Sequence, residues 1–237
     1  MAPPLGAPPP RFPTADRRPF MDFEQARFNM VEQQIRTWEV LDPTVLALLS
    51  SVRREDFVPH AHRALAFADL EIPLGDGQAM WQPKLEARVL QELEIKPVES
   101  ALEIGTGSGY LAALLAHTAK QVTSVELRPA LAARARQALE GEGLRNVTVL
   151  EGDSARAPVG EASYDVIVLT GSLPVLPQAF LDRLNPGGRL FAVVGDLPVM
   201  KALLVRQGAR GEFQQVELFE TVVKPLDHAQ QPARFRF

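Results

Sequence analysis

One glycine-rich stretch decides the fold: Ala101-Leu102-Glu103-Ile104-Gly105-Thr106-Gly107-Ser108-Gly109-Tyr110. A short apolar run ends near an acidic residue, and three alternating glycines then lead into a second apolar segment. Glycine has no Cβ and adopts positive φ readily, so the stretch predicts a tight turn from a strand into a helix. Its backbone can approach a ligand closely, which is typical of a nucleotide-binding turn.

The spacing of the glycines narrows the choice of ligand. Dinucleotide-binding turns follow G-x-G-x-x-G, whereas this chain has Gly105-x-Gly107-x-Gly109. No lysine follows the glycines, which excludes the phosphate loop GxxxxGK[ST]. The remaining pattern, E-x-G-x-G-x-G, resembles motif I of the S-adenosylmethionine-dependent methyltransferases. That resemblance implies that the acidic residue and the glycine backbone hold the methionine and ribose parts of the cofactor.

Two later apolar runs also end in carboxylates. The run 121–126 ends at Glu126, close to the roughly 20 residues expected between a glycine-rich turn and a ribose-binding acid. The run 146–154 places Asp153 just past a strand end, where it can accept the adenine amino group. Ligands of parallel sheets bind outside the carboxyl ends of the strands, so three acids in register predict a nucleoside site. Any one of them alone is equally well explained as a solvated loop carboxylate.

Composition limits the class of protein. A chain of 237 residues with 46% hydrophobic content can bury a sizeable core. A net charge of −4 and a pI near 5.7 leave no broad basic field, so we expect neither nucleic acid nor an anionic membrane as a partner. The absence of cysteine excludes disulfides, thiolate metal sites and a cysteine nucleophile. His60 and His62 lack a nearby acidic cluster, and we predict no metal site.

The first twenty residues differ from the rest of the chain. Seven prolines fall within residues 1–20 and predict a disordered or polyproline-like tail. Patterning typical of a folded chain begins at Met21, which we expect to be the natural start. The tail lacks the apolar core of a signal peptide, and no later run reaches the roughly 18 apolar residues of a membrane span. The sequence therefore predicts a cytoplasmic protein.

The remaining chain starts with helices and then alternates strands with helices. Helical patterning covers residues 23–36, with Phe28, Val31 and Ile35 on one stripe, and prolines open further helices at Pro43 and Pro83. Strands are predicted to end at residues 104, 126 and 151, followed by strands over 164–170 and 189–194 and strand-like runs over 202–205 and 216–223. This order predicts an α/β fold with a Rossmann-like, doubly wound, mostly parallel sheet of the class I methyltransferase type.

We expect the folded chain to form one compact unit built from two segments. Residues 21–98 are predicted to form the N-terminal helical and acceptor-motif segment. Residues 99–237 are predicted to form the Rossmann-like domain that binds S-adenosylmethionine. The sequence does not predict the oligomeric state.

Several further stretches resemble one methyltransferase family. They are Met30-Val31-Glu32-Gln33-Gln34-Ile35-Arg36, Arg54-Glu55-Asp56-Phe57-Val58-Pro59, Ile72-Pro73-Leu74-Gly75-Asp76-Gly77-Gln78, Glu151-Gly152-Asp153, Tyr164-Asp165-Val166-Ile167-Val168 and Gly187-Gly188-Arg189-Leu190. Together with the glycine turn, in this order, they closely resemble the protein-L-isoaspartate O-methyltransferase family over about residues 28–195. The resemblance implies methyl transfer to the carboxylate of isoaspartyl residues in damaged peptides or proteins. The ester then cyclises to a succinimide that can reopen as normal aspartate.

The resemblance also assigns residues to the site. It implies cofactor binding by Glu103, Gly105, Thr106, Gly107, Ser108, Gly109, Glu126, Leu127, Gly152, Asp153, Ser154 and Thr170. It places the acceptor at Gln78, Ala79, Met80 and Trp81. An acceptor carboxylate with a pKa near 4 is already ionised at neutral pH, so we assign no residue to proton transfer.

The acceptor motif departs from the family pattern. The family usually has G-x-G-Q-T-I-S-x-P, whereas residues 75–83 read Gly-Asp-Gly-Gln-Ala-Met-Trp-Gln-Pro. Ala79 and Trp81 replace a threonine and a serine, so two hydroxyl donors are missing, at about 1 to 3 kcal/mol per unsatisfied buried group. Trp81 can narrow the pocket, offer a stacking face and an indole N–H, or turn inward as core. Ser154, Gly171 and Ser172 are smaller departures.

Three hypotheses therefore remain open. The family resemblance favours repair of isoaspartyl residues. The changes at Ala79 and Trp81 favour a methyltransferase of the same fold with a different acceptor. The third hypothesis is a module that binds S-adenosylmethionine without turnover.

Overall fold

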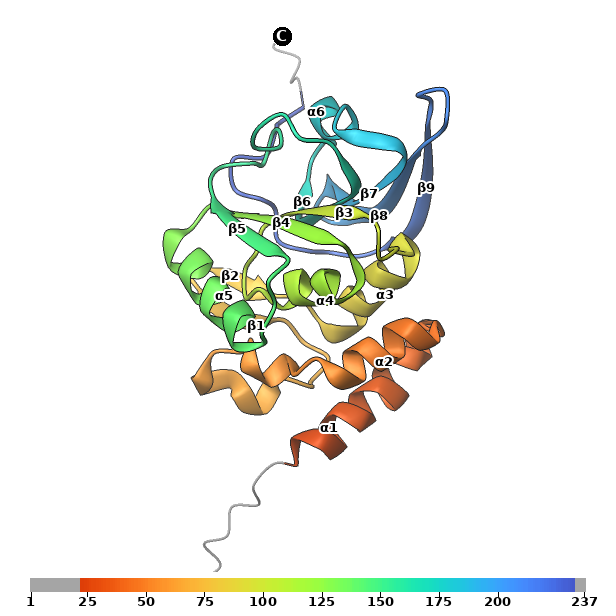
Figure 1. The fold of residues 1–237 in the computed structure, drawn as a ribbon. Helices are drawn as coiled ribbons and strands as arrows, with labels where there is room; N and C mark the ends of the chain where they lie inside the picture. Colours follow the sequence, from red (N-terminus) through yellow and green to blue (C-terminus); the bar gives the residue numbers. More distant parts are fainter. Residues whose placement is uncertain (1–21, 233–237) are drawn as a thin grey trace, which may run out of the picture.

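A seven-stranded sheet forms the centre of the molecule (Figure 1). The computed structural model describes residues 22–232, so the predicted tail and Met21 lie outside the described residues. The strand order is β5-β4-β3-β6-β7-β8-β9. Neighbours from β5 to β7 run parallel, and β8 and β9 are added antiparallel. The strands are β3 (Ser100–Ile104), β4 (Gln121–Glu126), β5 (Val147–Glu151), β6 (Tyr164–Leu173), β7 (Leu184–Asp196), β8 (Val199–Gln207) and β9 (Phe213–Glu220).

Helices and one hairpin complete the structure. The hairpin pairs β1 (Ile72–Gly75) with β2 (Gln78–Met80). The α-helices are α1 (Phe23–Met30), α2 (Pro43–Ser51), α3 (Pro83–Leu93), α4 (Tyr110–Thr118), α5 (Pro129–Gly141) and α6 (Gln178–Leu181). Within residues 22–232, no helix has the length and apolar character needed to cross a membrane. The predicted alternation of strands and helices from β3 onward is confirmed, and with it the Rossmann-like, mostly parallel sheet.

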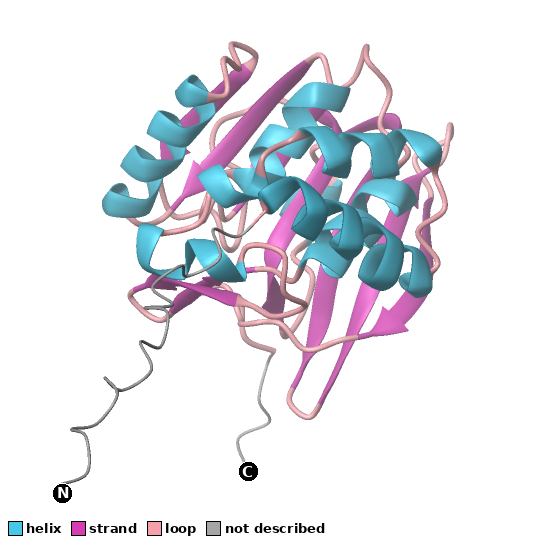
Figure 2. Cartoon of the chain, turned by 90° about the horizontal axis from the view of Figure 1, so that it is seen from below, coloured by secondary structure: helices cyan, strands magenta, loops and turns pink. Residues whose placement is uncertain are grey.

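The two faces of the sheet are covered differently. Helices α3, α4 and α5 lie across one face, and Figure 2 shows them in front of the strands. Side chains of alternate strand positions, such as Val166, Val168 and Phe191, pack there with the helices in the larger core. The opposite face packs Ile167 and Leu190 against Phe180 of α6 and the chain near residue 229. The second face therefore depends on loops and the chain end, with one short helix.

The N-terminal helices form a further layer outside α3 and α4 (Figure 1). Met30, Ile35 and Leu49 belong to the same buried cluster as the helices on the sheet. The division of the chain at residues 98 and 99 stays a prediction, because this shared core crosses it without marking a boundary.

The first helix departs from the predicted stripe. It breaks after Met30 into a π-helical turn (Val31–Ile35) and a 3₁₀ turn (Arg36–Trp38). Phe28 is 59% exposed, so its predicted place on the buried stripe is wrong. Arg27 takes the buried position instead, because its guanidinium pairs with the buried Glu55 at 2.6 Å. A buried ion pair thus sets which face of the helix points inward.

Strand β7 begins earlier than its apolar run suggests. It includes residues 185–188, which precede the strand predicted over 189–194, and the pairing with β6 is irregular there. Gly188 lies so close to the backbone that a Cβ would approach the carbonyl oxygen of Asn185 to 2.8 Å. The pairing with β6 passes from Leu184 to Arg189, so residues 185–188 form an irregular stretch at the start of the strand.

One buried arginine joins the N-terminal layer to the acceptor motif. Arg54 is fully buried, and its guanidinium forms an ion pair with Glu86 of α3. It also donates to the carbonyl oxygens of Ala66 (2.8 Å) and Trp81 (2.5 Å). Its Cζ lies 4.8 Å from the ring centre of Tyr110, the first residue of α4. Each of the three guanidinium nitrogens thereby has a hydrogen-bond acceptor within the protein.

Arg54→Met tests how much this link contributes to stability. The variant leaves Glu86 buried without its cation, so we expect a loss of about 3 to 5 kcal/mol in the free energy of unfolding. Urea denaturation followed by circular dichroism measures this loss. The double variant Arg54→Met/Glu86→Gln removes the orphaned charge and should recover part of it. Equal stability of Arg54→Met and the wild type would contradict the assigned role.

Candidate functional site

The glycine turn connects β3 to α4 at the carboxyl edge of the sheet. Gly105, Gly107 and Gly109 have φ values of 98°, 54° and 87°. A Cβ on Gly105 would lie 2.2 Å from the hydroxyl oxygen of Thr170, and one on Gly109 would lie 3.1 Å from the Cβ of Ala135 in α5. Conformation and close packing thus both require glycine, as the sequence pattern predicts.

Glu103 lies beneath this turn and is completely buried. Its Oε2 accepts a hydrogen bond from Ser124 (2.5 Å), whose hydroxyl also contacts that of Thr106. Its Oε1 has no hydrogen-bond partner among the described residues. Burial raises the pKa of Glu103; with the opposing hydrogen bond from Ser124 and the further rise caused by the carboxylates of Glu126 and Glu86, the pKa is about 8. The site therefore holds a carboxyl that lacks a compensating positive charge.

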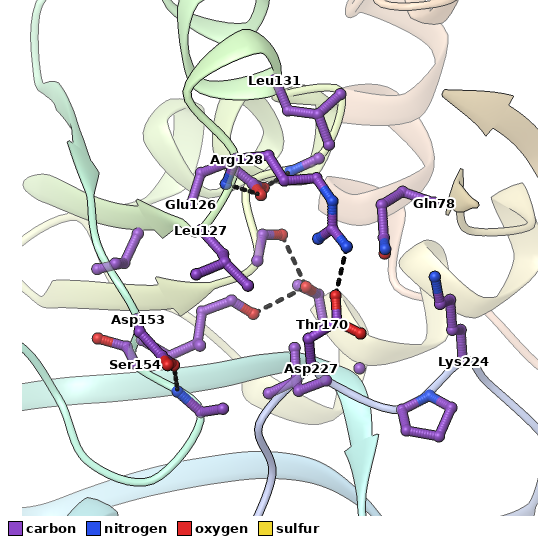
Figure 3. A pocket seen from close by; sticks show the side chains of 18 of the residues that line it. Gln78, Glu126, Leu127, Arg128, Leu131, Asp153, Ser154, Thr170, Lys224 and Asp227 are labelled. Carbon is purple, nitrogen blue, oxygen red and sulfur yellow. Dashed lines mark hydrogen bonds and ion pairs between the residues drawn. The ribbon is translucent and has the colours of Figure 1, made fainter. Parts of the chain in front are cut away.

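Glu126, at the end of β4, holds the turn from its other side. Its two carboxylate oxygens accept hydrogen bonds from the backbone N–H groups of Gly107 (2.8 Å) and Arg128 (3.0 Å). Each carboxylate oxygen has a second lone pair, so these bonds leave acceptor capacity toward the cleft. Figure 3 shows Glu126 and Arg128 side by side above the cleft. Binding of ribose hydroxyls by Glu126 stays a prediction.

The carboxyl edge of the sheet opens into a cleft, in which about 750 Å³ of space, open solvent included, is free of protein atoms. The predicted cofactor residues that line it are Gly105, Gly107, Glu126, Leu127, Gly152, Asp153, Ser154 and Thr170. Glu103, Thr106 and Ser108 line an adjoining recess, whereas Gly109, the N-cap residue of α4, lines neither space. Of the acceptor candidates, Gln78 lines the cleft, Met80 the recess, and Ala79 and Trp81 both. The structure thus brings both predicted sets together.

The chain end closes one side of the cleft, which the sequence does not predict. Residues 223–229, here called the C-terminal strap, run beside the end of β6. Ser172 donates its N–H to the carbonyl oxygen of Lys224 (3.0 Å) and accepts from the N–H of Leu226 (3.0 Å). A Cβ on Gly171 would lie 2.8 Å from the Leu226 side chain. In the sequence, the small residues Gly171 and Ser172 are the one sign that another segment packs against the end of β6.

The strap also contacts Asp153. Nδ1 of His228 lies 2.6 Å from Oδ2 of Asp153. This hydrogen bond is the main reason that the pKa of Asp153 lies below its usual range. Asp153 is thus held as a carboxylate at the far end of the cleft from the acceptor hairpin (Figure 3). Its predicted contact with the adenine amino group stays a prediction.

Trp81 combines two of the roles considered for it. The residue is 8% exposed, and its ring packs edge-on against Phe191 with 6.3 Å between ring centres. It also lines both the cleft and the recess. The indole therefore belongs to the hydrophobic core and forms a wall of the site.

Two cations lie at the acceptor end of the cleft. Arg128 forms an ion pair with Asp227 of the strap. With its amide oriented so that Oε1 faces the cations, Gln78 accepts from Nη2 of Arg128 (2.7 Å) and from Nζ of Lys224 (2.7 Å). Lys224 also donates to the carbonyl oxygen of Gly77 (2.6 Å). The strap and the acceptor hairpin are therefore joined through these side chains.

The sheet order, the glycine turn and the cleft outside the strand ends define a Rossmann-like methyltransferase fold of class I type. A family model described as protein-L-isoaspartate(D-aspartate) O-methyltransferase matches residues 25–230. The chain belongs to this family, which confirms the resemblance inferred from its motifs.

Individual relatives agree with the family match. The chain is 41% identical over 191 residues to protein-L-isoaspartate O-methyltransferase 1 of Syntrophobacter fumaroxidans, covering 81% of this chain and 89% of the relative. It is 36% identical over 214 residues to the protein-L-isoaspartate O-methyltransferase of Koribacter versatilis, covering 90% and 96%. A crystal structure described as this enzyme from Plasmodium falciparum, in complex with S-adenosyl-L-homocysteine, superposes with a TM-score of 0.73 at 17% identity. The superposition covers 86% of this chain and 98% of the Plasmodium falciparum chain, and it shows that the two share a fold.

Glu103→Gln tests the raised pKa of the buried Glu103 carboxyl. In the folded protein Glu103 keeps its proton up to about pH 8, whereas in the unfolded chain it loses it near 4.5. Between these values the folded state binds more protons, so Glu103 makes wild-type stability fall as the pH rises. Glutamine removes this dependence. We expect the stability of the variant relative to the wild type to increase by up to about 1.4 kcal/mol per pH unit.

Urea denaturation at pH 5 and pH 7.5 measures this difference. Glu140→Gln, at an exposed glutamate of α5, is the control and should show no comparable trend. A stability difference between Glu103→Gln and the wild type that stays constant over this range would contradict the raised pKa.

Proposed function

We propose that the protein transfers a methyl group from S-adenosylmethionine to the carboxylate of isoaspartyl residues in damaged peptides or proteins. The observation that carries this proposal is the match of the family model to residues 25–230. The cleft supports it, because the glycine turn and Asp153 lie along one part and the acceptor hairpin along another. A single cleft can thus hold a cofactor and a peptide side by side.

The residues present fit S-adenosylmethionine. Two buried polar atoms at the site have no partner among the described residues, namely Oε1 of Glu103 and the hydroxyl of Ser154. The unpaired carboxyl suits the ammonium of the methionine part, and Glu126 and Asp153 line the cleft where a nucleoside would lie. We propose that Glu103, Thr106 and Ser108 surround the methionine end, Glu126 the ribose and Asp153 the adenine. When bound, the cofactor supplies a methyl group on a positively charged sulfur.

The side chains would act by positioning. An acceptor carboxylate with an ordinary pKa near 4 is ionised at neutral pH and needs no base. Holding the carboxylate in line with the methyl group removes translational and rotational entropy from the barrier, a contribution of up to about 7 to 11 kcal/mol. Trp81 and the C-terminal strap line this end of the cleft. A cytoplasmic location for this activity stays a prediction.

A different carboxylate acceptor is the second candidate function. Ala79 and Trp81 line the cleft without side-chain hydroxyls, so they cannot donate the O–H bonds that the family motif supplies there. The indole ring at Trp81 also adds bulk to the wall of the recess. A panel of peptide and small-molecule carboxylates would separate this candidate from isoaspartyl repair.

Methyl transfer from labelled S-adenosylmethionine to an isoaspartyl peptide tests the proposal. The same peptide with a normal aspartyl residue is the control. We expect label only in the isoaspartyl peptide, released by mild base as methanol because the product is an ester. No label, in protein that binds S-adenosylhomocysteine by calorimetry, would overturn isoaspartyl repair and favour another acceptor or a non-catalytic role.

Asp153→Ala tests the proposed adenine contact. Asp153 is partly exposed, and loss of one hydrogen bond to its charge should weaken S-adenosylhomocysteine binding by about five- to tenfold. Isothermal titration calorimetry measures the affinity. Because the substitution also removes the bond to His228, His228→Ala is the matched control and should bind nearly as the wild type does. Equal losses in both variants would show that Asp153 acts through the strap.

A further inference from the structure

Lys224 carries a positive charge that is attracted to the nearby Asp227 of the strap but is not paired with it. Its Nζ donates to two uncharged oxygens, the carbonyl of Gly77 (2.6 Å) and Oε1 of Gln78 (2.7 Å). Within residues 22–232, no carboxylate lies within ion-pair distance of it, whereas the neighbouring Arg128 is paired with Asp227. An ammonium has three N–H donors, so one donor of Lys224 is left for a ligand.

The position of this ammonium is suited to an acceptor. Lys224 is exposed and lines the same cleft as Gln78 and Ala79 of the acceptor hairpin. Figure 3 shows the ends of the Lys224 and Gln78 side chains pointing toward each other. A peptide entering at the hairpin would therefore meet this charge.

The hairpin itself offers no side-chain hydroxyl to a carboxylate. Ala79 and Trp81 stand where the family motif has threonine and serine, and the Trp81 ring is packed on Phe191. A donor for the acceptor carboxylate must come from elsewhere. Lys224 supplies one, from a segment far along the chain.

We propose that Lys224 binds the acceptor carboxylate and so takes over the role of the missing hydroxyls. The proposal rests on the proposed function, since it assumes that the acceptor is a carboxylate, and it names a residue that determines acceptor specificity. Lys224 is thus a binding residue that touches the substrate from the strap.

A second ionisable group in the cleft, Glu71, helps to orient the acceptor carboxylate. Glu71 also lines the cleft and precedes Ile72, which pairs with Met80. Glu71 therefore belongs to the Trp81 end of the hairpin, while Lys224 contacts the Gly77 end. Burial raises the pKa of Glu71, and its ionised form repels another carboxylate. Lys224 attracts the acceptor carboxylate toward the Gly77 end of the hairpin, and Glu71 repels it from the Trp81 end only when Glu71 is ionised.

This role predicts a particular kinetic signature. The carboxylate loses its negative charge as it attacks the methyl group, so its attraction to Lys224 is stronger in the bound substrate than in the transition state. Removing the lysine should therefore raise KM without lowering kcat. A residue needed only for folding or for cofactor binding would not produce this combination.

Lys224→Met is the test variant, and Lys224→Arg keeps the charge. We expect Lys224→Met to raise KM for the isoaspartyl peptide about five- to tenfold, with kcat unchanged or slightly higher and the affinity for S-adenosylhomocysteine unchanged. Lys224→Arg should recover most of the lost affinity. Lys120→Met is the matched control, because Lys120 is an exposed lysine just before β4, at the opposite edge of the sheet. It should leave KM unaltered.

A binding measurement keeps the proposal independent of turnover. Protein saturated with S-adenosylhomocysteine is titrated with the isoaspartyl peptide and with the same peptide carrying a neutral carboxamide in place of the acceptor carboxylate. We expect the wild type to prefer the carboxylate peptide, and Lys224→Met to lose this preference.

The outcomes separate the two proposals. Selective methylation by the wild type with an unchanged KM in Lys224→Met would overturn the role of Lys224 and leave isoaspartyl repair standing. Carboxylate binding that depends on Lys224, without methylation, would overturn repair and support Lys224. A wild type that neither methylates the isoaspartyl peptide nor prefers it to the carboxamide would overturn both.

Discussion

The buried guanidinium of Arg54 determines how the parts of the site lie relative to one another. A charge without water is costly, by several kcal/mol, unless every one of its hydrogen-bond partners is in place. Here the partners come from the loop at Ala66, the acceptor motif at Trp81 and helix α3 at Glu86. The same group stacks on Tyr110, where α4 leaves the glycine turn. The acceptor motif and the cofactor turn are therefore positioned by one side chain.

The acids near the glycine turn create a second constraint. Burial raises the pKa of Glu86 to about 7 and that of Glu103 to about 8, and Glu126 adds a negative charge close by. Arg54 compensates Glu86 alone. A ligand that carries positive charge, as S-adenosylmethionine does on its sulfur, would favour the ionised form of these acids and be attracted to it. The product has lost that charge, so the same electrostatics would hold it less firmly.

Local patterns in the sequence predict the frame of the molecule well. The alternation of strands and helices can be recognised from periodicity within each element, and the glycine turn from the spacing of residues 105–109. The prediction from sequence fails where a residue far along the chain determines the position of a side chain or segment. Phe28 is exposed because Arg27 pairs with Glu55, 28 residues away. The strap is missed for the same reason, since His228 meets Asp153 across 75 residues and no periodicity links them.

The acceptor motif shows the same difference between local sequence patterns and contacts made by residues far apart in the chain. A motif compared position by position loses two hydroxyl donors at Ala79 and Trp81. In the folded chain, however, Lys224 reaches Gly77 across 147 residues and brings a cation to the same end of the cleft. A binding site requires a donor at a point in space, whichever segment of the chain supplies it. The changes within the hairpin therefore do not by themselves argue against a carboxylate acceptor, because the strap and the hairpin form that end of the cleft together.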